Sequence, residues 1–367
     1  MSSLHGLILG LGLFFLGLQL TGQNMRALSG GSFRNLVRRL TDSPWLAGVC
    51  GVLAGALMQS ATAVTFILVS MLGSGVIQSA AAGLVLVWCN VGLTAFAFLA
   101  AFNISPLVAY LVGGAGILMG AVRTKPWNTY AGAFLGVGII LFGLEQVGSG
   151  LAPLKEAAWF SEVLEMALGS PVLAFAIGFA ASALLQSNTG AAMVVITLAQ
   201  GGALKVSEGM PIIYGANLGA ILLRMFLASG LKGSSVRLVR MEDLFCVFGG
   251  VLMMGLLFAE KAGIPLVLGL AERMDGGAPI QLALVFLLSN LIPAIVFTPL
   301  LPLCDAALKK FYPSDPSDKP HCPKYLTNQA LADPESALDL IPKELARLFA
   351  SVNLSKVRGV GEGDADE

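Results

Sequence analysis

The sequence predicts an all-α polytopic membrane protein made of two inverted-topology repeats, each with a re-entrant helical hairpin. Composition is the first observation behind this prediction. Of the 367 residues, 56% are hydrophobic and 12% are charged, whereas soluble domains average about 25% charged residues. The apolar residues also form runs near the length that crosses a bilayer. Finally, one polar motif interrupts two of these runs, and the short arms beside it predict hairpins rather than full spans.

The polar motif occurs twice, as Gln59-Ser60-Ala61-Thr62 and as Gln186-Ser187-Asn188-Thr189, and the copies lie 127 positions apart. Other polar positions match at the same offset without a gap. They are Ser43-Pro44 with Ser170-Pro171, and Asn90-x-Gly92 with Asn217-x-Gly219. Two unrelated apolar segments would match at scattered leucines and alanines instead, so the spacing indicates an internal repeat.

The first repeat is expected over residues 1–127. The arms beside its polar motif have about 10 to 15 residues, and at 1.5 Å per residue neither crosses a ~30 Å hydrocarbon core. They therefore predict a hairpin that returns to the side it entered from. No basic region precedes the first span, which argues against a cleaved signal peptide. In chain order we expect a span at 4–22, a basic connector at 23–42, a hairpin at about 44–74, and spans at about 80–101 and 104–122.

The second repeat is expected over residues 128–260, with an acidic connector in place of the basic one. Residues 261–305 add a loop and a final span at about 280–303, which makes about seven full spans. Residues 306–367 form a polar cytoplasmic tail with one short helix near 335–352, where apolar residues recur at helical spacing. The elements of the second repeat are a span at about 129–148, a connector at 150–169, a hairpin at about 171–202, a span at about 208–229, a basic loop at 230–241 and a span at about 243–259.

Basic residues set the predicted orientation, because loops that stay in the cytoplasm carry more Lys and Arg. The connector at 23–42 holds four arginines and is placed inside. The basic loops at 123–125 and 230–241 then also fall inside, and the acidic connector falls outside. The amino terminus therefore lies outside and the tail lies in the cytoplasm, with the chain in the inner (plasma) membrane. Each repeat has three full crossings, so the repeats are inverted and their polar motifs can meet near the midplane.

Both polar motifs offer groups that bind ions without a charged side chain. Ser and Thr hydroxyls donate to anionic oxygens, and the amide oxygens of Gln59 and Gln186 can face a cation. A broken helix adds free N–H groups at an amino end and free C=O groups at a carboxyl end. Since neither motif holds Arg or Lys, a bound anion could still be released. The plainer interpretation is that these side chains only join helices, but two matching motifs at broken helices favour a binding site.

Other polar residues in the spans have two interpretations each. Asn90 and Asn217 either face the hairpin tips or form hydrogen bonds between helices beside a close glycine contact. Glu145 and Arg224 are expected near span ends, where both can reach the interface. Arg224 could instead assist an anion at the inner exit. Glu242-Asp243 is expected to open a helix after the basic loop and to stabilise its amino end.

Several function classes are disfavoured by the residues that are present. A net charge of zero gives a nucleic acid no electrostatic footprint. The five cysteines have no metal or disulfide spacing and are expected to be small packing residues, so no transition metal is expected. The two histidines, His5 and His321, lie outside the core spans, and no nucleophile–base pair occurs within them. We therefore do not expect an enzyme.

The doubled Gln-Ser-hydroxyl motif, the Gly-Ala-Asn-Leu-Gly at 215–219 and the Leu-Gly-Leu-Phe-Phe-Leu-Gly at 11–17 resemble the type II sodium–phosphate cotransporter family, in its bacterial branch. The resemblance covers roughly residues 7–305. It implies Na⁺-driven import of inorganic phosphate, with substrate and ions held on the Gln-Ser-Ser-Ser motifs of the hairpins. Ala61, Asn188 and Thr189 stand where that motif has serine. Carried over residue by residue, the resemblance points to Gln59, Ser60 and Thr62, with Thr65 nearby, and to Gln186, Ser187, Asn188 and Thr189.

Together these observations predict a sodium-coupled symporter that imports inorganic phosphate by alternating access. The alternatives are a sodium-coupled symporter of another small anion, and a membrane sensor or regulator that transports nothing. Expected partners are the anion, Na⁺ as the coupling ion in place of any cofactor, and the lipid bilayer, with a homodimer as one option for the assembly. The substrate is expected at Ser60, Thr62, Ser187, Asn188 and Thr189, and sodium at Gln59, Thr65, Gln186, Asn90 and Asn217.

Overall fold

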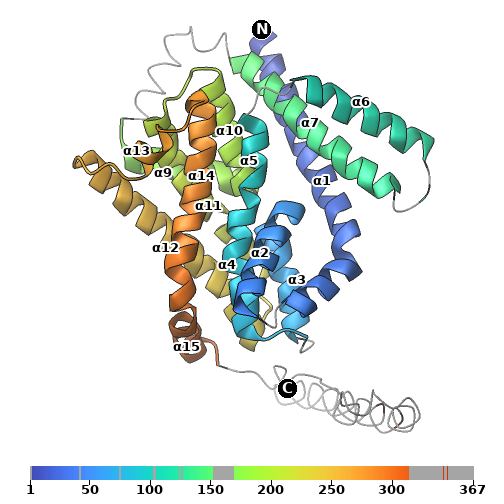
Figure 1. Cartoon of the computed structure of the whole chain (residues 1–367), viewed down its shortest axis with the longest axis vertical. Helices are drawn as coiled ribbons and strands as arrows, with labels where there is room; N and C mark the ends of the chain where they lie inside the picture. Colours follow the sequence, from blue (N-terminus) through green and yellow to red (C-terminus); the bar gives the residue numbers. More distant parts are fainter. Residues whose placement is uncertain are drawn as a thin grey trace, which may run out of the picture. The chain divides into compact units, whose positions relative to one another are not determined.

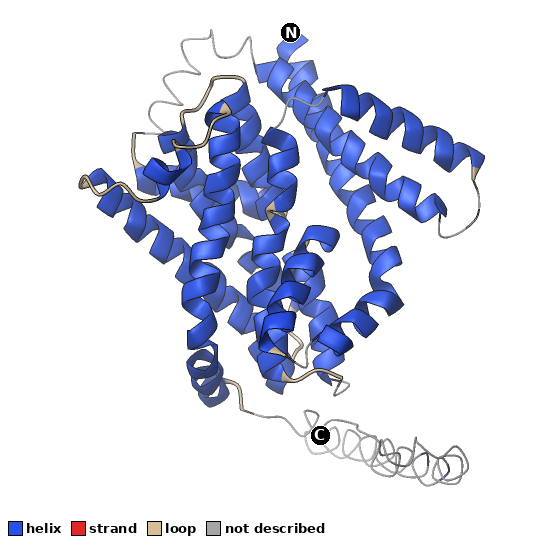
Figure 2. Cartoon of the chain, in the orientation of Figure 1, coloured by secondary structure: helices blue, strands red, loops and turns tan. Residues whose placement is uncertain are grey.

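In the computed structural model, every regular element among the described residues is a helix (Figure 2). This confirms the all-α prediction. The chain divides into two units, 1–318 and 319–367, and the described part of the second unit is Pro342 and Leu345. The tail helix predicted near 335–352 therefore lies, apart from those two positions, outside the described residues. The structure describes residues 2–40, 43–73, 76–101, 105–122, 124, 127–151, 169–313, 342 and 345.

Figure 1 shows the helices of the first unit, and most of the acidic connector expected at 150–169 lies outside the described residues. In chain order the helices are α1 (Ser2–Leu40), α2 (Pro44–Met58), α3 (Ala61–Gly73), α4 (Ser79–Leu93), α5 (Ala95–Ala101), α6 (Ser105–Ala121), α7 (Trp127–Leu151), α9 (Pro171–Leu185), α10 (Asn188–Gln200), α11 (Val206–Leu227), α12 (Gly233–Lys261), α13 (Val267–Ala271), α14 (Gly277–Phe297), the 3₁₀ turn η2 (Thr298–Leu300) and α15 (Leu301–Phe311).

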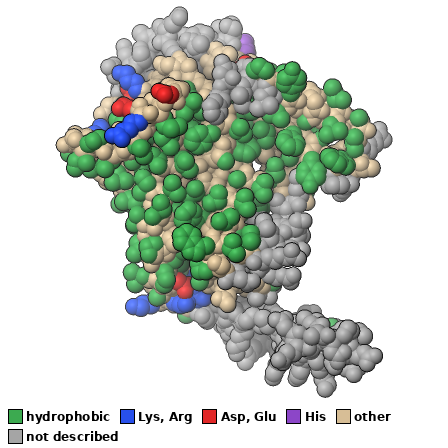
Figure 3. Space-filling view, in the orientation of Figure 1, with side chains coloured by type: hydrophobic (Ala, Val, Ile, Leu, Met, Phe, Trp, Pro, Cys, Tyr) green, Lys and Arg blue, Asp and Glu red, His purple; other side chains and the backbone are tan. Residues whose placement is uncertain are grey.

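Six stretches of the described helices are long and apolar enough to cross a membrane. This confirms a multi-span membrane protein. The span expected at 104–122 corresponds to α6, whose 17 residues make it shorter than those six. Hydrophobic side chains cover the middle of the face seen in Figure 3, and charged side chains of the described residues gather toward its two ends. The six stretches are His5–Met25, Ser79–Ala101, Trp127–Gly150, Val206–Leu227, Gly233–Lys261 and Gly277–Phe311.

The internal repeat reappears in the helix boundaries. Helices α2 and α9 both have 15 residues and begin 127 positions apart, at Pro44 and Pro171. Helices α3 and α10 both have 13 residues, and α4 and α11 begin at the same offset, at Ser79 and Val206. In each copy a proline occupies the first turn, where its missing N–H costs nothing. The same local sequence signals thus produce the same elements twice.

The loop expected at 230–241 is wrong, because most of it is helical, and the amphipathic, basic connector expected at 23–42 is part of a helix as far as Leu40. Residues 23–40 continue α1 without a break, since no proline interrupts them. The loop expected at 230–241 shrinks to residues 228–232, and α12 begins at Gly233. Residues 236, 238, 239 and 241 of this segment are apolar and buried, so packing against the core favours helix there. The carboxyl end also differs, because α15 extends the helical part to Phe311.

Three helix pairs build most of the first unit: α1 lies along α7, α2 along α4, and α9 along α11 (Figure 1). One hydrophobic core joins α10, α11 and α14, and a second joins α2, α3 and α4. Helix α12 packs against α3, α4, α11 and α14, so it contacts both copies of the repeat. The polar motifs sit at the ends of α2 and α9, between these two cores.

Candidate functional site

Both helix pairs break at a glutamine with the same unusual backbone. Gln59 ends α2 with a φ of 49° and Gln186 ends α9 with a φ of 52°. Among the described residues they are the two non-glycine residues with positive φ. This left-handed conformation costs a non-glycine residue roughly 1–2 kcal/mol, and such residues cluster at functional sites. The two motifs therefore share the same unusual backbone conformation at the same position.

The serine of each motif caps the helix that follows. Ser60 Oγ accepts a hydrogen bond from the Ala63 N–H at 3.2 Å. Ser187 Oγ accepts one from the Gly190 N–H at 2.9 Å. Capping uses only the oxygen, so each hydroxyl still has its O–H to donate. The first N–H groups of a helix have no backbone partner within it, and in α10 the Thr189 N–H donates to Asn188 Oδ1 at 2.9 Å.

A small cavity of about 20 Å³ lies between the two motifs. That volume holds about one water molecule. Eight of the ten predicted site residues line it, so the structure brings both copies of the motif and both mid-repeat asparagines together. The lining residues are Gln59, Ser60, Ala61, Thr62, Asn90, Gln186, Ser187, Asn188, Asn217, Ala220, Arg224 and Cys246.

The other two predicted residues do not line this cavity. Thr65 is buried inside α3, and its hydroxyl donates to the Ala61 carbonyl at 2.8 Å. Thr189 is buried at the start of α10, and its Oγ1 has no hydrogen-bond partner among the described residues. Thr189 does line a larger cavity of about 700 Å³, which also reaches Gln59, Ser60, Thr62, Gln186 and Ser187. The larger cavity therefore gives access to the motifs from one side.

Asn90 and Asn217 both face the cavity between the motifs and form hydrogen bonds between helices. They line the small cavity, and each also bonds to another helix. Asn90 Nδ2 donates to Glu242 Oε1 at 2.9 Å, and Asn217 Nδ2 donates to Ser289 Oγ at 3.1 Å. The Asn217 Oδ1 atom is buried without a partner among the described residues. A Cβ at Gly92, two residues after Asn90, would clash with the Val52 carbonyl of α2, so the close glycine contact is present as well.

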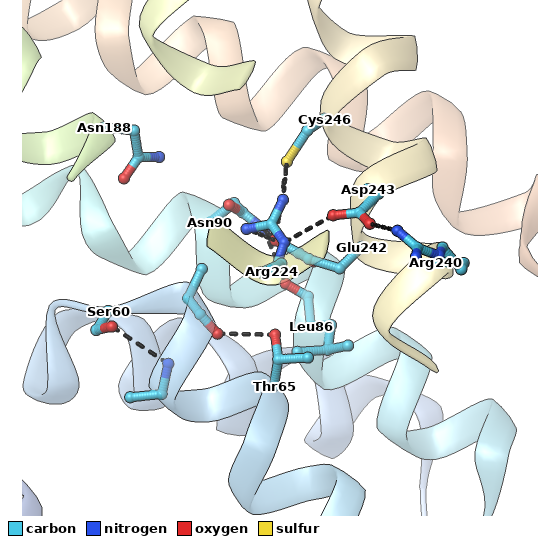
Figure 4. Close-up of polar contacts among 12 residues, drawn as sticks. Ser60, Thr65, Leu86, Asn90, Asn188, Arg224, Arg240, Glu242, Asp243 and Cys246 are labelled. Carbon is cyan, nitrogen blue, oxygen red and sulfur yellow. Dashed lines mark hydrogen bonds and ion pairs between the residues drawn. The ribbon is translucent and has the colours of Figure 1, made fainter. Parts of the chain in front are cut away.

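Arg224 is buried within the protein, whereas it was expected near a span end with access to the interface. Its side chain is 1% exposed, lines the small cavity and donates from Nε to Asp243 Oδ1 at 2.8 Å (Figure 4). Glu242-Asp243 was also misplaced, because α12 starts at Gly233 and both carboxylates are buried inside it. The apolar positions of 236–241, which continue at helical spacing into α12, are the signal that could have revealed this.

Glu145 lies away from the motifs, and three of the cysteines are buried. Glu145 is exposed and lines a third cavity, of about 630 Å³, which none of the motif residues lines. Cys50, Cys89 and Cys246 are buried and free, which fits packing, although Cys246 also lines the small cavity. Cys322 lies outside the described residues.

The comparisons with known proteins point to one family. The sequence model of the family described as Na+/Pi-cotransporter matches the chain twice, over residues 13–149 and 139–287. Two relatives carry the name "Putative inorganic phosphate export protein YjbB". That of Salmonella typhimurium is 23% identical over 355 residues, which are 95% of this chain and 63% of the relative. That of Escherichia coli K12 is 24% identical over the same shares.

A further relative, the uncharacterized protein YqeW of Bacillus subtilis, is 22% identical over 78% of this chain and 92% of its own length. The chain thus spans less than two thirds of the length of the YjbB proteins that it matches. No solved structure matches it significantly. The two matches of the family model fall on the two halves that the repeated motif defines.

Proposed function

The chain belongs to the Na+/Pi-cotransporter family, and from this premise we propose that it carries inorganic phosphate across the membrane together with Na⁺. The observation that carries the proposal is the cavity lined by both copies of the Gln-Ser motif. Both copies contribute equivalent groups, so one central site serves the two repeats. Its lining groups suit an oxyanion and a small cation, and the adjoining cavity of about 700 Å³, which shares Gln59, Ser60 and Ser187 with it, has the room to admit them.

The anion is held by hydroxyls and by the amino ends of two helices. Ser60 and Ser187 each cap a helix and keep an O–H to donate. Helices α3 and α10 start at the cavity, so their partly positive amino ends face it together. Thr62 and Asn188 add side-chain donors from the first turns of the same helices. Thr189 joins them when the larger cavity is continuous with the small one.

The cation is held by amide oxygens. Gln59 Oε1 and Asn217 Oδ1 are buried acceptors without a hydrogen-bond partner among the described residues, and both residues line the cavity. Leaving such atoms unpaired costs about 1–3 kcal/mol each, and Na⁺ would remove that cost. Gln186 and Asn90 line the same cavity. Thr65 contributes less directly, because its hydroxyl is bonded to the Ala61 carbonyl within α3.

The architecture behind this site consists of two inverted repeats, residues 1–127 and 128–260. The helix pairs α2–α3 and α9–α10 are re-entrant hairpins, since none of these four helices exceeds 15 residues. Basic segments lie inside in the inner membrane, the amino terminus lies outside and the tail is cytoplasmic. The transport cycle then alternates access to the site between the two sides.

Coupling to Na⁺ has a physical reason. An inside-negative potential opposes the arrival of an anion by about 2.3 kcal/mol per charge per 100 mV. A Na⁺ ion that crosses with the anion cancels that charge and contributes its own gradient. We therefore propose import as the physiological direction. Export is the second candidate, because the name of the YjbB relatives specifies it.

The test is uptake of labelled phosphate into proteoliposomes that contain the folded protein. An inward Na⁺ gradient should drive accumulation, and replacing Na⁺ by K⁺ should abolish it. Equal uptake with either ion would contradict sodium coupling. Competition by arsenate, sulfate and small carboxylates tests the substrate, since a stronger competitor than phosphate would favour the symporter of another anion. Outward gradients across vesicles loaded with phosphate then test export.

A further inference from the structure

Arg224 brings a full positive charge to the cavity, and neither copy of the motif accounts for it. It extends from α11, the helix that also carries Asn217, and it lines the same small cavity as Ser60 and Asn188 (Figure 4). Its side chain is 1% exposed, inside a stretch that is long and apolar enough to cross the membrane. A buried charge at such a place is costly, and it usually marks a substrate or ion pathway.

The charge of Arg224 is balanced by two carboxylates, of which Asp243 is hydrogen-bonded to the guanidinium and Glu242 is not. Asp243 receives Arg224 Nε at 2.8 Å and Arg240 Nη1 at 3.0 Å, so both its oxygens are bonded. Glu242 Oε1 lies 3.9 Å from Arg224 Nη1, which is too far for a hydrogen bond. The Glu242 Oε2 atom is buried without a partner among the described residues. Asp243 therefore anchors the guanidinium, while Glu242 balances its charge only loosely.

Arg224 also has N–H donors that the hydrogen bonds in the structure do not use. A guanidinium has five N–H groups in a planar fork that matches an oxyanion. The bonds in the structure use Nε, toward Asp243, and Nη2, toward Cys246 Sγ at 3.2 Å. Nη1 faces Glu242 across the long ion pair and can take a closer oxygen in its place. An anion that replaces Glu242 would gain charge-assisted hydrogen bonds.

We propose that Arg224 is the cationic ligand of the transported anion and that Glu242 is the internal counterion which the anion displaces. This inference rests on the proposed function and specifies its binding site. In the empty protein, Arg224, Arg240, Glu242 and Asp243 sum to zero charge. A bound anion then adds negative charge that a co-bound cation must offset, which gives coupling to Na⁺ a structural cause. Competition from Glu242 also lets the anion leave again.

The decisive variant is Glu242→Gln, which removes the counterion but keeps an oxygen for the amide of Asn90. Phosphate should bind more tightly, and the KM for uptake should fall about fivefold or more, since no carboxylate competes for Arg224. The empty carrier would return with an unbalanced charge. Net uptake should therefore slow much more than exchange of labelled for unlabelled phosphate. A purely structural role would slow uptake and exchange equally and leave the KM unchanged, and that result overturns the inference.

Variants of Arg224 test the ligand itself. Arg224→Gln should raise the KM for phosphate at least about tenfold, and Arg224→Lys should lie between it and the wild type, because Lys keeps the charge but loses the fork. The control is Glu208→Gln, since the Glu208 carboxylate accepts the Lys205 N–H at the start of α11 and an amide oxygen can do the same. The control should transport like the wild type.

A double variant guards against misfolding. Arg224→Gln with Asp243→Asn removes both charges of the 2.8 Å pair, so neither is left buried alone. If Arg224 is the anion ligand, this folded double variant keeps the raised KM for phosphate, whereas a wild-type KM would show that Arg224 was only a structural partner. Absence of uptake by the wild type contradicts the proposed function itself. Wild-type uptake with an unchanged KM in Arg224→Gln contradicts this inference alone.

Discussion

The amide of Gln59 shows how one side chain both shapes a break in a helix and leaves a ligand free. Its Nε2 donates to the carbonyls of Gly55 at 3.2 Å and Ala56 at 3.0 Å, in the last turn of α2. The bond to Ala56 helps to satisfy a carbonyl at the end of the helix, and the Gly55 carbonyl also accepts the Gln59 backbone N–H at 3.0 Å. The Oε1 atom of the same amide is buried without a partner among the described residues. The nitrogen therefore serves structure, and the oxygen is left for a cation.

The serines of the motifs give a prediction at this scale. Ser60→Ala and Ser187→Ala each remove a helix cap, worth about 1 kcal/mol, and a donor to the anion. Loss of a hydrogen bond to a charged group should raise the KM for phosphate by roughly tenfold or more. Uptake at varied phosphate concentration measures this. The matched control is Ser170→Ala, because Ser170 caps α9 in the same way but does not line the cavity. If all three variants lose transport equally, the effect belongs to capping and not to binding.

Among the helices, glycine controls how closely the pairs of each repeat approach. A Cβ at Gly92 of α4 would meet the Val52 carbonyl of α2, and a Cβ at Gly215 of α11 would meet the Phe175 carbonyl of α9. Both obstacles are backbone atoms, which cannot turn away as a side chain can. Because Asn90 and Asn217 lie on these same two helices, the glycine contacts also fix how far each asparagine reaches into the cavity.

Replacing these glycines should therefore destabilise the protein and disturb the site. Gly92→Ala and Gly215→Ala should each lower the free energy of unfolding by about 1–3 kcal/mol, the usual cost of overpacking, and should reduce phosphate uptake. The control is Gly255→Ala in α12, where a Cβ meets nothing within 4 Å and where alanine favours helix. Thermal unfolding in detergent measures all three. Equal melting temperatures for the three variants would contradict the close approach.

The elements also show what the sequence could predict. The helix pairs around the motifs were expected at the right places, because Ser-Pro starts and polar breaks are local signals. The early start of α12 was not expected. The charges of Arg237 and Arg240 favoured a loop, whereas the burial of their apolar neighbours favours helix. Arg224 was misjudged for a different reason. Its partner Asp243 lies 19 positions away on another helix, and no local pattern reveals such a pairing.

The first unit as a whole holds two large cavities toward opposite ends of its helices. The 700 Å³ cavity is lined by Ser70 near the end of α3 and by Leu227 at the end of α11. The 630 Å³ cavity is lined by Ala101 at the end of α5 and by Gly276 before α14. Only the first of these two cavities is lined by motif residues. In the proposed orientation this cavity opens to the cytoplasm, which predicts that the structure is an inward-facing state of the proposed cycle.

That assignment predicts a two-sided labelling pattern for cysteines placed in a chain whose own five cysteines have been replaced. Ser70→Cys lines the 700 Å³ cavity and should react with a membrane-impermeant thiol reagent in inverted vesicles only. Ser149→Cys lines the 630 Å³ cavity and should react in intact cells only. Ser229 and Ser207, exposed at opposite ends of α11, give the inner and outer reference positions when each is changed to Cys.

The reference positions Ser229→Cys and Ser207→Cys show whether the two repeats are inverted or parallel. The polar motifs follow α2 and α9, which hold equivalent places in the two copies, so a parallel repeat would send both hairpins in from one side. In the inverted arrangement, α3 ends toward the cytoplasm and α10 ends toward the outside. Ser70→Cys should therefore follow Ser229→Cys, and Ser149→Cys, beside the end of α10, should follow Ser207→Cys. Labelling of Ser70→Cys and Ser149→Cys from the same side would exclude inverted topology, and with it alternating access through two hairpins that meet from opposite faces.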